Sequence, residues 1–289
     1  MEGGKLKNIV IVILLLLNLF LAVLVGGRRL ETAQSAESAR QNAIEVLRGN
    51  GVSIKDAAVP RTVDLRFAQV ERELAQEQAF AAAVLMGEVD VENRGGEVYR
   101  YTNANGRVQF HSAGEFWAEF APGAYLLSDR TSGEHGAAVL ARLGIDAVVL
   151  DDGVKQGNGS IVFCQTVEGV SVLDCRVTLH YDNGSLVQMS NGRRVAGELV
   201  FSAHSGEMTV ATVLVRLFNG MKELGDVYDR VEAITPSYTL GGTPGAPAQL
   251  NPVWHVRTDT GEYLLDLGSG KISRWDGTLT TAMDLAGHE

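Results

Sequence analysis

The sequence predicts an α+β fold, in which a single N-terminal transmembrane helix is followed by repeated units of one helix packed on an antiparallel sheet. Three observations lead to this class. An uncharged apolar run covers residues 8–27. After it, segments with apolar residues three and four apart are followed by segments that alternate, and this order recurs three times. Tight-turn sequences such as Asp182-Asn-Gly-Ser185 separate the alternating segments. Hydrophobic residues form 45% of the 289 positions, which is enough for a sizeable core.

The apolar run lies between the charged residues Lys5 and Lys7 and the pair Arg28 and Arg29. A helix of about 20 residues spans the roughly 30 Å hydrocarbon core of a bilayer. A cleaved signal peptide is the alternative, with Ala33-Gln-Ser35 as its cleavage site. That site lies well beyond the run and both arginines intervene, so an uncleaved anchor is favoured. We therefore expect a single-pass cell-membrane protein with residues 1–7 as a cytoplasmic tail and its C-terminal part extracellular.

Asn18 is a polar residue in the middle of this run. An unpaired side-chain amide is costly in a bilayer, and a partner helix can satisfy it with a hydrogen bond that contributes about 0.6 to 2 kcal/mol. The amide can also bond to its own helix backbone or to water. Asn18 is the candidate partner-binding residue of the transmembrane helix.

The first helix-and-sheet cycle follows the anchor and defines an N-terminal extracytoplasmic α+β domain at residues 28–130. Apolar spacing, alternation and strong helix formers predict its elements. They are a helix at Thr32 to Arg48, a strand at Thr62 to Val70, a helix at Glu71 to Met86 and a strand meander from Glu97 to Phe120.

Two further cycles define a C-terminal extracytoplasmic α+β domain at residues 131–289. Each begins with a helix, at Glu134 to Leu143 and at Thr209 to Leu224, and Thr209 suits the N-cap of the second. Between the first of these helices and its strands we expect a loop rich in Gly and Asp. The predicted strands are Ile161 to Val167, Ser171 to Tyr181, Leu186 to Met189, Val227 to Tyr238, Val253 to Arg257 and Tyr263 to Leu267.

Cys164 and Cys175 are the two cysteines of the chain, and they flank a predicted hairpin turn at Gly169 and Val170. With that turn, the two cysteines lie directly opposite each other. Opposed Cα atoms of a non-hydrogen-bonded pair are about 4.5 Å apart, near the lower limit for a disulfide. A cross-strand disulfide is one hypothesis, and two reduced core cysteines are the other.

The composition excludes broad electrostatic binding of nucleic acid. The chain has a formal net charge of −10, and four of its basic residues flank the apolar run, so the part beyond is more acidic still. The six histidines lack metal-ligand spacing, and we expect His180 and His255 on sheet faces. The carboxylates at 88, 90 and 92 and at 151 and 152 are expected on the solvated surface. No catalytic motif, metal site or cofactor site is recognised, so the chain is not expected to be an enzyme.

Several segments resemble the YycH/YycI family, in particular its YycI branch. At the N-terminus these are Lys7-Asn-Ile with the following Leu17-Asn-Leu-Phe-Leu, and an alanine-rich helix ending in Asn50-Gly-Val-Ser-Ile. Toward the C-terminus the similar segments are Phe163-Cys-Gln-Thr-Val-Glu-Gly-Val-Ser-Val-Leu and Leu250-Asn-Pro-Val-Trp-His-Val, which also look like distant PepSY-like proteins.

This resemblance implies a membrane-anchored, non-enzymatic regulator of a two-component system. Members associate with a sensor histidine kinase that controls cell-wall metabolism, and with a YycH-like sister protein, through the transmembrane helix and the outer domain. The alternative is an extracytoplasmic ligand-binding or peptidoglycan-binding module, or a PepSY-like protease inhibitor. Under that alternative Trp117, Trp254 and Trp275 are candidates for stacking on sugar, although strand tryptophans are commonly core residues.

Overall fold

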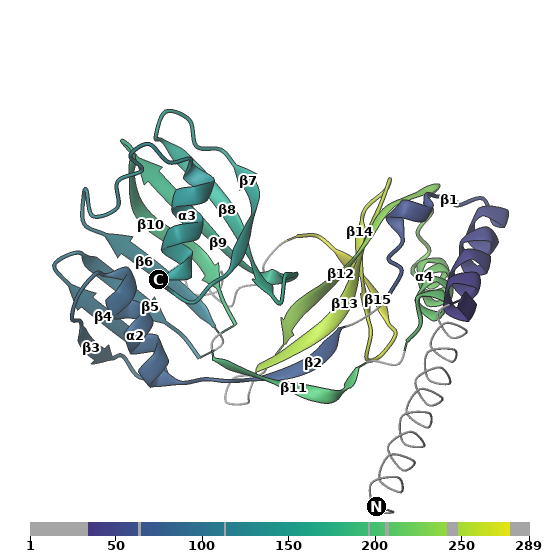
Figure 1. The fold of residues 1–289 in the computed structure, drawn as a ribbon, viewed down its shortest axis with the longest axis horizontal. Coiled ribbons are helices and arrows are strands. Elements are labelled where there is room, and N and C mark those ends of the chain that lie inside the picture. The colour runs from purple at the N-terminus through teal and green to yellow at the C-terminus, as the bar shows by residue number, and fades with distance from the viewer. Residues whose placement is uncertain are drawn as a thin grey trace, which may run out of the picture.

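The computed structural model describes residues 34–62, 65–112, 114–195, 197–205, 208–241 and 248–277. In this part of the chain four α-helices pack on strands that are predominantly antiparallel, so the predicted α+β class is confirmed. Figure 1 shows two bodies side by side, each with helices over one sheet. We call their sheets sheet A and sheet B.

Sheet A belongs to the body nearer the N-terminus. Its strands lie in the order β11, β2, β13, β12. Strand β13 also pairs with β14, beyond the stretch that pairs with β2, and β15 pairs with β14. The short β1 pairs with β12 in parallel. The strands are β1 (Ser53–Ile54), β2 (Arg66–Glu71), β11 (Glu198–Ser205), β12 (Arg230–Gly241), β13 (Ala248–Thr258), β14 (Glu262–Asp266) and β15 (Ile272–Trp275).

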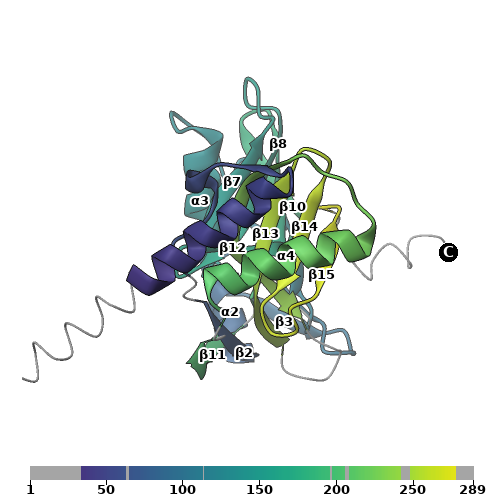
Figure 2. The same ribbon diagram turned by 90° about the vertical axis from the view of Figure 1, so that its right-hand side faces the viewer.

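Two helices cover one face of sheet A, as Figure 2 shows. The first occupies residues 34–49, and a 3-10 turn, η1 (Asp56–Ala58), follows β1. The second is α4 (Val210–Leu224), which begins at the predicted cap, where the Thr209 hydroxyl accepts from the Thr212 amide. It ends at Gly225, whose left-handed φ of 71° suits glycine. Apolar side chains of both helices and of the strands form the first core.

Sheet B has the strand order β7, β8, β9, β10, β6, β5, β4, β3. It is antiparallel throughout, and tight turns join its neighbouring hairpin strands. The strands are β3 (Asp90–Asn93), β4 (Tyr99–Asn103), β5 (Gly106–Phe110), β6 (Glu115–Phe120), β7 (Ala147–Asp152), β8 (Gly159–Val167), β9 (Val170–Asp182) and β10 (Ser185–Arg193).

The helices α2 (Leu74–Val84) and α3 (Ser132–Ala141) cover one face of sheet B and complete the second core. Thr131 and Glu134 form a reciprocal capping box that starts α3. Gly136 brings this helix close to the sheet, since a Cβ atom there would lie 2.6 Å from the Phe163 ring.

Strand β9 joins the two bodies because it contributes to both cores. Val172 and Cys175 pack in the first core, whereas Val177 and Leu179 pack in the second. Near its start β9 also pairs in parallel with β12, through Val172 and Tyr238. The two sheets are therefore one hydrogen-bonded network of strands.

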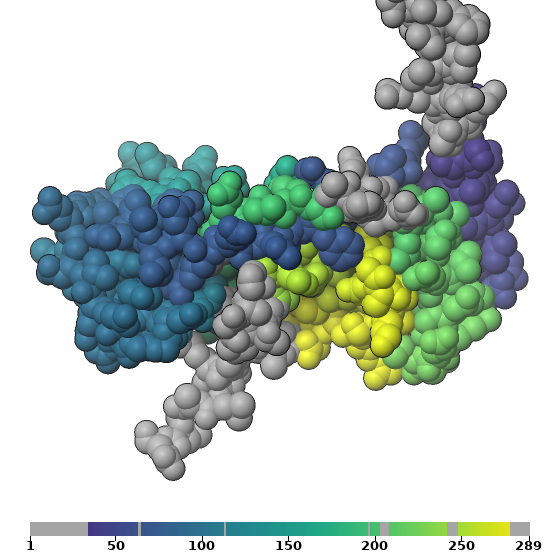
Figure 3. All heavy atoms as spheres, turned by 90° about the horizontal axis from the view of Figure 1, so that it is seen from below, coloured from purple at the N-terminus to yellow at the C-terminus, as the bar shows by residue number. Residues whose placement is uncertain are grey.

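The boundary predicted between residues 130 and 131 does not separate these cores. The chain leaves the first body after β2, builds the second body with residues 74–193 and returns through β11, which pairs with β2. Figure 3 shows the blue and green residues of these crossing segments between the two bodies. Both ends of the described chain thus contribute to the first core, which contains residues from both sides of residue 130.

Candidate interaction surface

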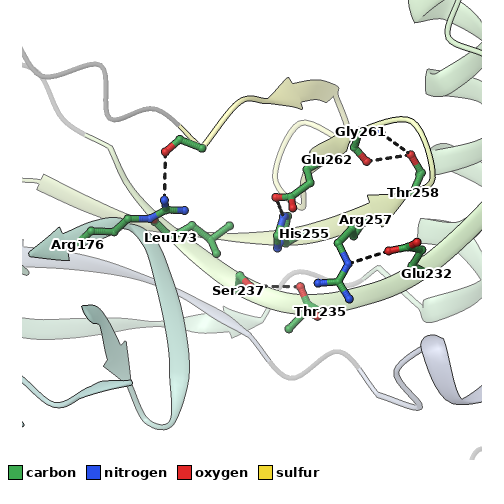
Figure 4. Close-up of polar contacts among 11 residues, drawn as sticks. Leu173, Arg176, Glu232, Thr235, Ser237, His255, Arg257, Thr258, Gly261 and Glu262 are labelled. Carbon is green, nitrogen blue, oxygen red and sulfur yellow. Dashed lines mark hydrogen bonds and ion pairs between the residues drawn. The ribbon is translucent and has the colours of Figure 1, made fainter. Parts of the chain in front are cut away.

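Each sheet has a second face that its own helices do not cover. On sheet A the side chains of Ile234, Leu240, Trp254 and Val256 point into the first core. Side chains alternate along a strand, so the intervening residues of β12, β13 and β14 point to the opposite face. We call this opposite face the open face of sheet A, and Figure 4 shows its polar residues.

Two charged pairs organise the open face of sheet A. His255 Nε2 lies 2.8 Å from Glu262 Oε2 across the β13–β14 pair. Arg257 Nε donates to Glu232 Oε2 at 3.1 Å across the β12–β13 pair. All four side chains reach solvent, and in Figure 4 each member of a pair points toward its partner. His255 lies on a sheet face, as the sequence predicted.

Arg176 of β9 closes one end of this open face and links the two bodies. Its guanidinium donates to the Leu173 carbonyl at 2.8 Å and to the Gly277 carbonyl at 3.1 Å. The guanidinium carbon also lies 5.7 Å from the centre of the Trp275 ring. Ser237, next to this junction on β12, is almost fully buried and donates to the Thr235 carbonyl.

Asp174 makes a second polar link at the junction. Its carboxylate pairs with Arg193 at 2.7 Å and accepts from the Leu240 amide of β12 at 2.8 Å. Burial raises the pKa of Asp174, and the charge of Arg193 opposes that shift. These contacts tie β9, β10 and β12 together beside the open face of sheet A.

The corresponding face of sheet B carries an aromatic residue between two cations. The Trp117 ring of β6 lies 5.7 Å from the Arg100 guanidinium and 5.3 Å from that of Arg107. Arg107 in turn pairs with Glu119 at 2.6 Å. Three tryptophans are candidates for sugar stacking. Of these, Trp117 lies on an open sheet face and has polar neighbours.

The other two tryptophans have different surroundings. Trp254 is fully buried in the first core, which excludes stacking on a ligand. Trp275 is half-buried beside Arg176. The expectation that strand tryptophans are commonly core residues is met at Trp254.

His180 also lies on the open face of sheet B, as predicted. Its Nδ1 is 2.8 Å from Ser160 Oγ and its Nε2 is 2.6 Å from Ser190 Oγ. The three residues come from the adjacent strands β8, β9 and β10, so both ring nitrogens are occupied by protein partners. The described residues contain no group of three or more His, Cys, Asp or Glu side chains suited to a metal ion.

The strand register predicted around the two cysteines was wrong. The turn is Glu168-Gly169, and a β-bulge between Cys164 and Thr166 shifts the pairing, so that Cys164 lies opposite Arg176 rather than Cys175. Because neighbouring residues of a strand point to opposite faces, the two sulfurs are directed to different sides of the β8–β9 pair. Both thiols are free and buried.

The predicted carboxylate groups lie at the surface. Glu92 pairs with Arg94 at 2.8 Å, and Asp90 is exposed on the edge strand β3. Asp152 accepts from the Ser132 hydroxyl at 2.7 Å. Asp151 and Asp152 belong to strand β7 rather than to the loop expected there.

Asn18 and the apolar run at residues 8–27 lie outside the described residues. Among the helices that the structure does describe, none has the length and apolarity needed to cross a membrane.

Comparison with known proteins gives distant structural similarities. The chain is similar to an uncharacterized protein from Eubacterium rectale at 15% identity, with 78% of this chain and 90% of that chain covered and a TM-score of 0.43. It is also similar to the Bacillus megaterium YpeB C-terminal domain at 12% identity, with 72% and 99% covered and a TM-score of 0.37. No protein-family model and no curated protein matches the chain, so membership of the YycH/YycI family stays an expectation.

Proposed function

We propose that this protein is a membrane-anchored, extracytoplasmic regulator that associates with a sensor histidine kinase and modulates its activity in control of cell-wall metabolism. In this proposal residues 8–27 form the anchor, Asn18 contacts a helix of the kinase, and a YycH-like sister protein is a further partner. Regulation of this kind needs no catalytic residue in the chain. It needs a stiff connection between the anchor and the outer domain.

The packing of the first helix supports this proposal more than any other observation. The described part of the chain opens within a helix at position 34, seven residues after the last residue of the apolar run. Ile44 and Leu47 of this helix are buried in the first core. In the sequence only six residues, 28–33, separate the apolar run from the described helix, so a displacement of the anchor has a short path to the outer domain.

Two arginines fix the first helix against the turn that follows β1. The buried Arg40 donates to Glu37 at 2.7 Å and to the Asp56 carbonyl at 3.4 Å. Arg48 donates to the Ile54 carbonyl at 2.7 Å and pairs with the Asp56 carboxylate at 2.6 Å. The hydrogen bond from Arg40 lowers the pKa of Glu37 to about 2, so this pair persists over the physiological pH range.

A flexible insertion tests the proposed coupling in intact membranes. A Gly/Ser segment of about six residues between Leu30 and Glu31 leaves both the anchor and the outer domain in place but removes the stiff connection. We expect the kinase to co-purify with this variant while regulation of its activity is lost. The matched control has the same insert in the Gly/Pro-rich connection between β12 and β13, and should regulate normally. Equal regulation by both variants would contradict the coupling.

Exchange of the anchor separates this proposal from the ligand-binding alternative. The position of Trp117 on the open face of sheet B supports that second reading, in which the anchor only retains the protein. An unrelated apolar helix in place of residues 8–27 should abolish regulation under the first proposal and preserve function under the second. Asn18→Leu should likewise weaken association with the kinase, by about threefold to thirtyfold for the loss of one interhelical hydrogen bond, and so reduce its recovery.

A further inference from the structure

Sheet B has two free edges in the part of the chain that the structure describes, and their side chains differ. At one edge, β3 presents the charged residues Asp90 and Glu92. At the other, β7 presents three consecutive apolar residues that are half-exposed, Val148 at 46%, Val149 at 46% and Leu150 at 49%. Charged residues commonly protect an edge strand from pairing with other chains. The middle of β7 lacks this protection.

The backbone of β7 offers hydrogen-bonding groups on its free side. The Thr166 amide of β8 donates to the Asp146 carbonyl at 2.7 Å, which makes residues 146 and 166 a hydrogen-bonded pair. Hydrogen-bonded and non-hydrogen-bonded pairs alternate along an antiparallel ladder. Val148 therefore bonds to β8, whereas the N–H and C=O groups of Ala147 and Val149 point away from it.

Carboxylates stand at both ends of this apolar edge. Asp146 and Asp151 are exposed, and Asp152 is held by Ser132 and by the Val154 amide. Such charges favour a partner segment whose apolar residues are flanked by lysine or arginine. The net charge of −10 opposes the pairing of two copies of this chain along the same edge.

We propose that the free edge of β7 is a docking site for an extended segment of a partner protein, which adds a strand to sheet B. Ala147 and Val149 supply the main-chain hydrogen bonds, the half-exposed side chains contact the apolar residues of the segment, and Asp146 and Asp151 pair with its basic ends. The site rests on the geometry of sheet B and holds independently of the anchor and of the kinase.

Two synthetic peptides probe the site on the full-length protein in detergent. One is an alternating Val/Thr peptide with lysine at both ends, and the other has glutamate at both ends. The lysine-flanked peptide should bind saturably and slow amide hydrogen exchange in residues 146–152. The glutamate-flanked peptide should bind at least about tenfold more weakly, because two favourable charge contacts become repulsive.

Proline substitution provides a matched pair of variants. Val149→Pro removes an amide that faces the free side and leaves the β8 ladder intact. Val91→Pro is the control. The Arg94 amide donates to the Val98 carbonyl at 2.9 Å, so residues 94 and 98 are a hydrogen-bonded pair. By the same alternation, Val91 and Tyr101 are a non-hydrogen-bonded pair, and the Val91 amide points to the free side of β3. We expect Val149→Pro to weaken peptide binding about tenfold or more, and Val91→Pro to leave it unchanged.

Asp151→Lys keeps the test decisive if Val149→Pro folds poorly. Asp151 is an exposed residue, so its substitution should preserve the fold; because Asp146 is unchanged, each peptide then meets one favourable and one repulsive charge, and the preference between the two peptides should be lost. The proposal is overturned if the lysine-flanked peptide does not bind, or if Asp151→Lys binds both peptides as the parent does. Sedimentation that shows a dimer, lost in Val149→Pro, would assign the edge to a second copy of the chain instead.

Discussion

At the scale of single residues, a buried ionic cluster holds the two chain crossings between the bodies. Glu77 of α2 accepts from Arg72, just after β2, at 2.9 Å, and lies 3.5 Å from Arg194, just after β10. Arg194 also lies between the rings of Phe80 and Phe110. Burial lowers the pKa of Arg194 to about 10, which still leaves it charged at neutral pH. We call Arg72, Glu77 and Arg194 the crossover cluster.

Removal of the buried carboxylate should be costly, because it leaves Arg194 charged and without its partner. We expect Glu77→Gln to lower the free energy of unfolding by about 3 to 5 kcal/mol, measured by chemical denaturation. Glu119→Gln is the matched control, since Glu119 pairs with Arg107 in solvent, and it should cost less than about 1 kcal/mol. Similar losses for the two variants would show that the crossover cluster contributes no more than a surface pair.

At the scale of elements, the sequence predicted the helices and strands whose apolar residues recur with a clear helical or alternating period. The helix predicted at Thr209 to Leu224 is α4, with its cap at Thr209, and the strand predicted at Ser171 to Tyr181 is β9. The strands β1, β3, β7, β11 and β15 were missed. In β7 the apolar residues are consecutive and do not alternate, so the sequence lacks the period that indicates a strand. Pairing with β8 at the edge of sheet B defines this strand.

The register of β8 and β9 also could not be read from the sequence. Two turns, at Glu168-Gly169 and at Gly169-Val170, suit the same residues. The register shift between Cys164 and Thr166 then places Cys164 opposite Arg176, whereas Thr166 lies opposite Ser171. A bulge adds one residue without a distinctive local signal. The pairs on the open face of sheet A, such as His255 with Glu262, depend on register in the same way.

The two sides of α4 provide a test of its packing. Leu217 is fully buried in the first core, whereas Val215 is half-exposed on the same helix. Leu217→Ala should therefore cost about 2 to 5 kcal/mol of unfolding free energy through the cavity that it leaves. Val215→Ala should change stability by less than about 0.5 kcal/mol. If thermal denaturation ranked the two variants in the opposite order, the assigned face of α4 would be wrong.

At the scale of the whole molecule, the shared strand β9 makes the two bodies depend on each other. The sequence predicted two domains separated after residue 130, because it shows cycles in chain order but not which distant segments meet. The first core is discontinuous, and β2 and β11 are neighbours although more than a hundred residues separate them. Local periodicity carries no information on such pairings.

Loss of packing in either core should therefore destabilise both bodies together. Leu214→Ala in the first core and Leu179→Ala in the second should each lower the free energy of unfolding by about 2 to 5 kcal/mol and leave one common unfolding transition. Circular dichroism and tryptophan fluorescence should give coincident curves. Two separated transitions in either variant would show that the bodies unfold independently.

The split construction of the first body also sets an order of assembly during synthesis. Residues 74–193 are contiguous and contain the whole second core, so this core can begin to form before the rest of the chain is made. The helix at residues 34–49, made earlier, must wait for α4 and the strands that follow it. At about 5 to 20 residues per second this delay is roughly 10 to 45 seconds. Among the described helices, the helix at residues 34–49 thus keeps its apolar side unburied longest during synthesis.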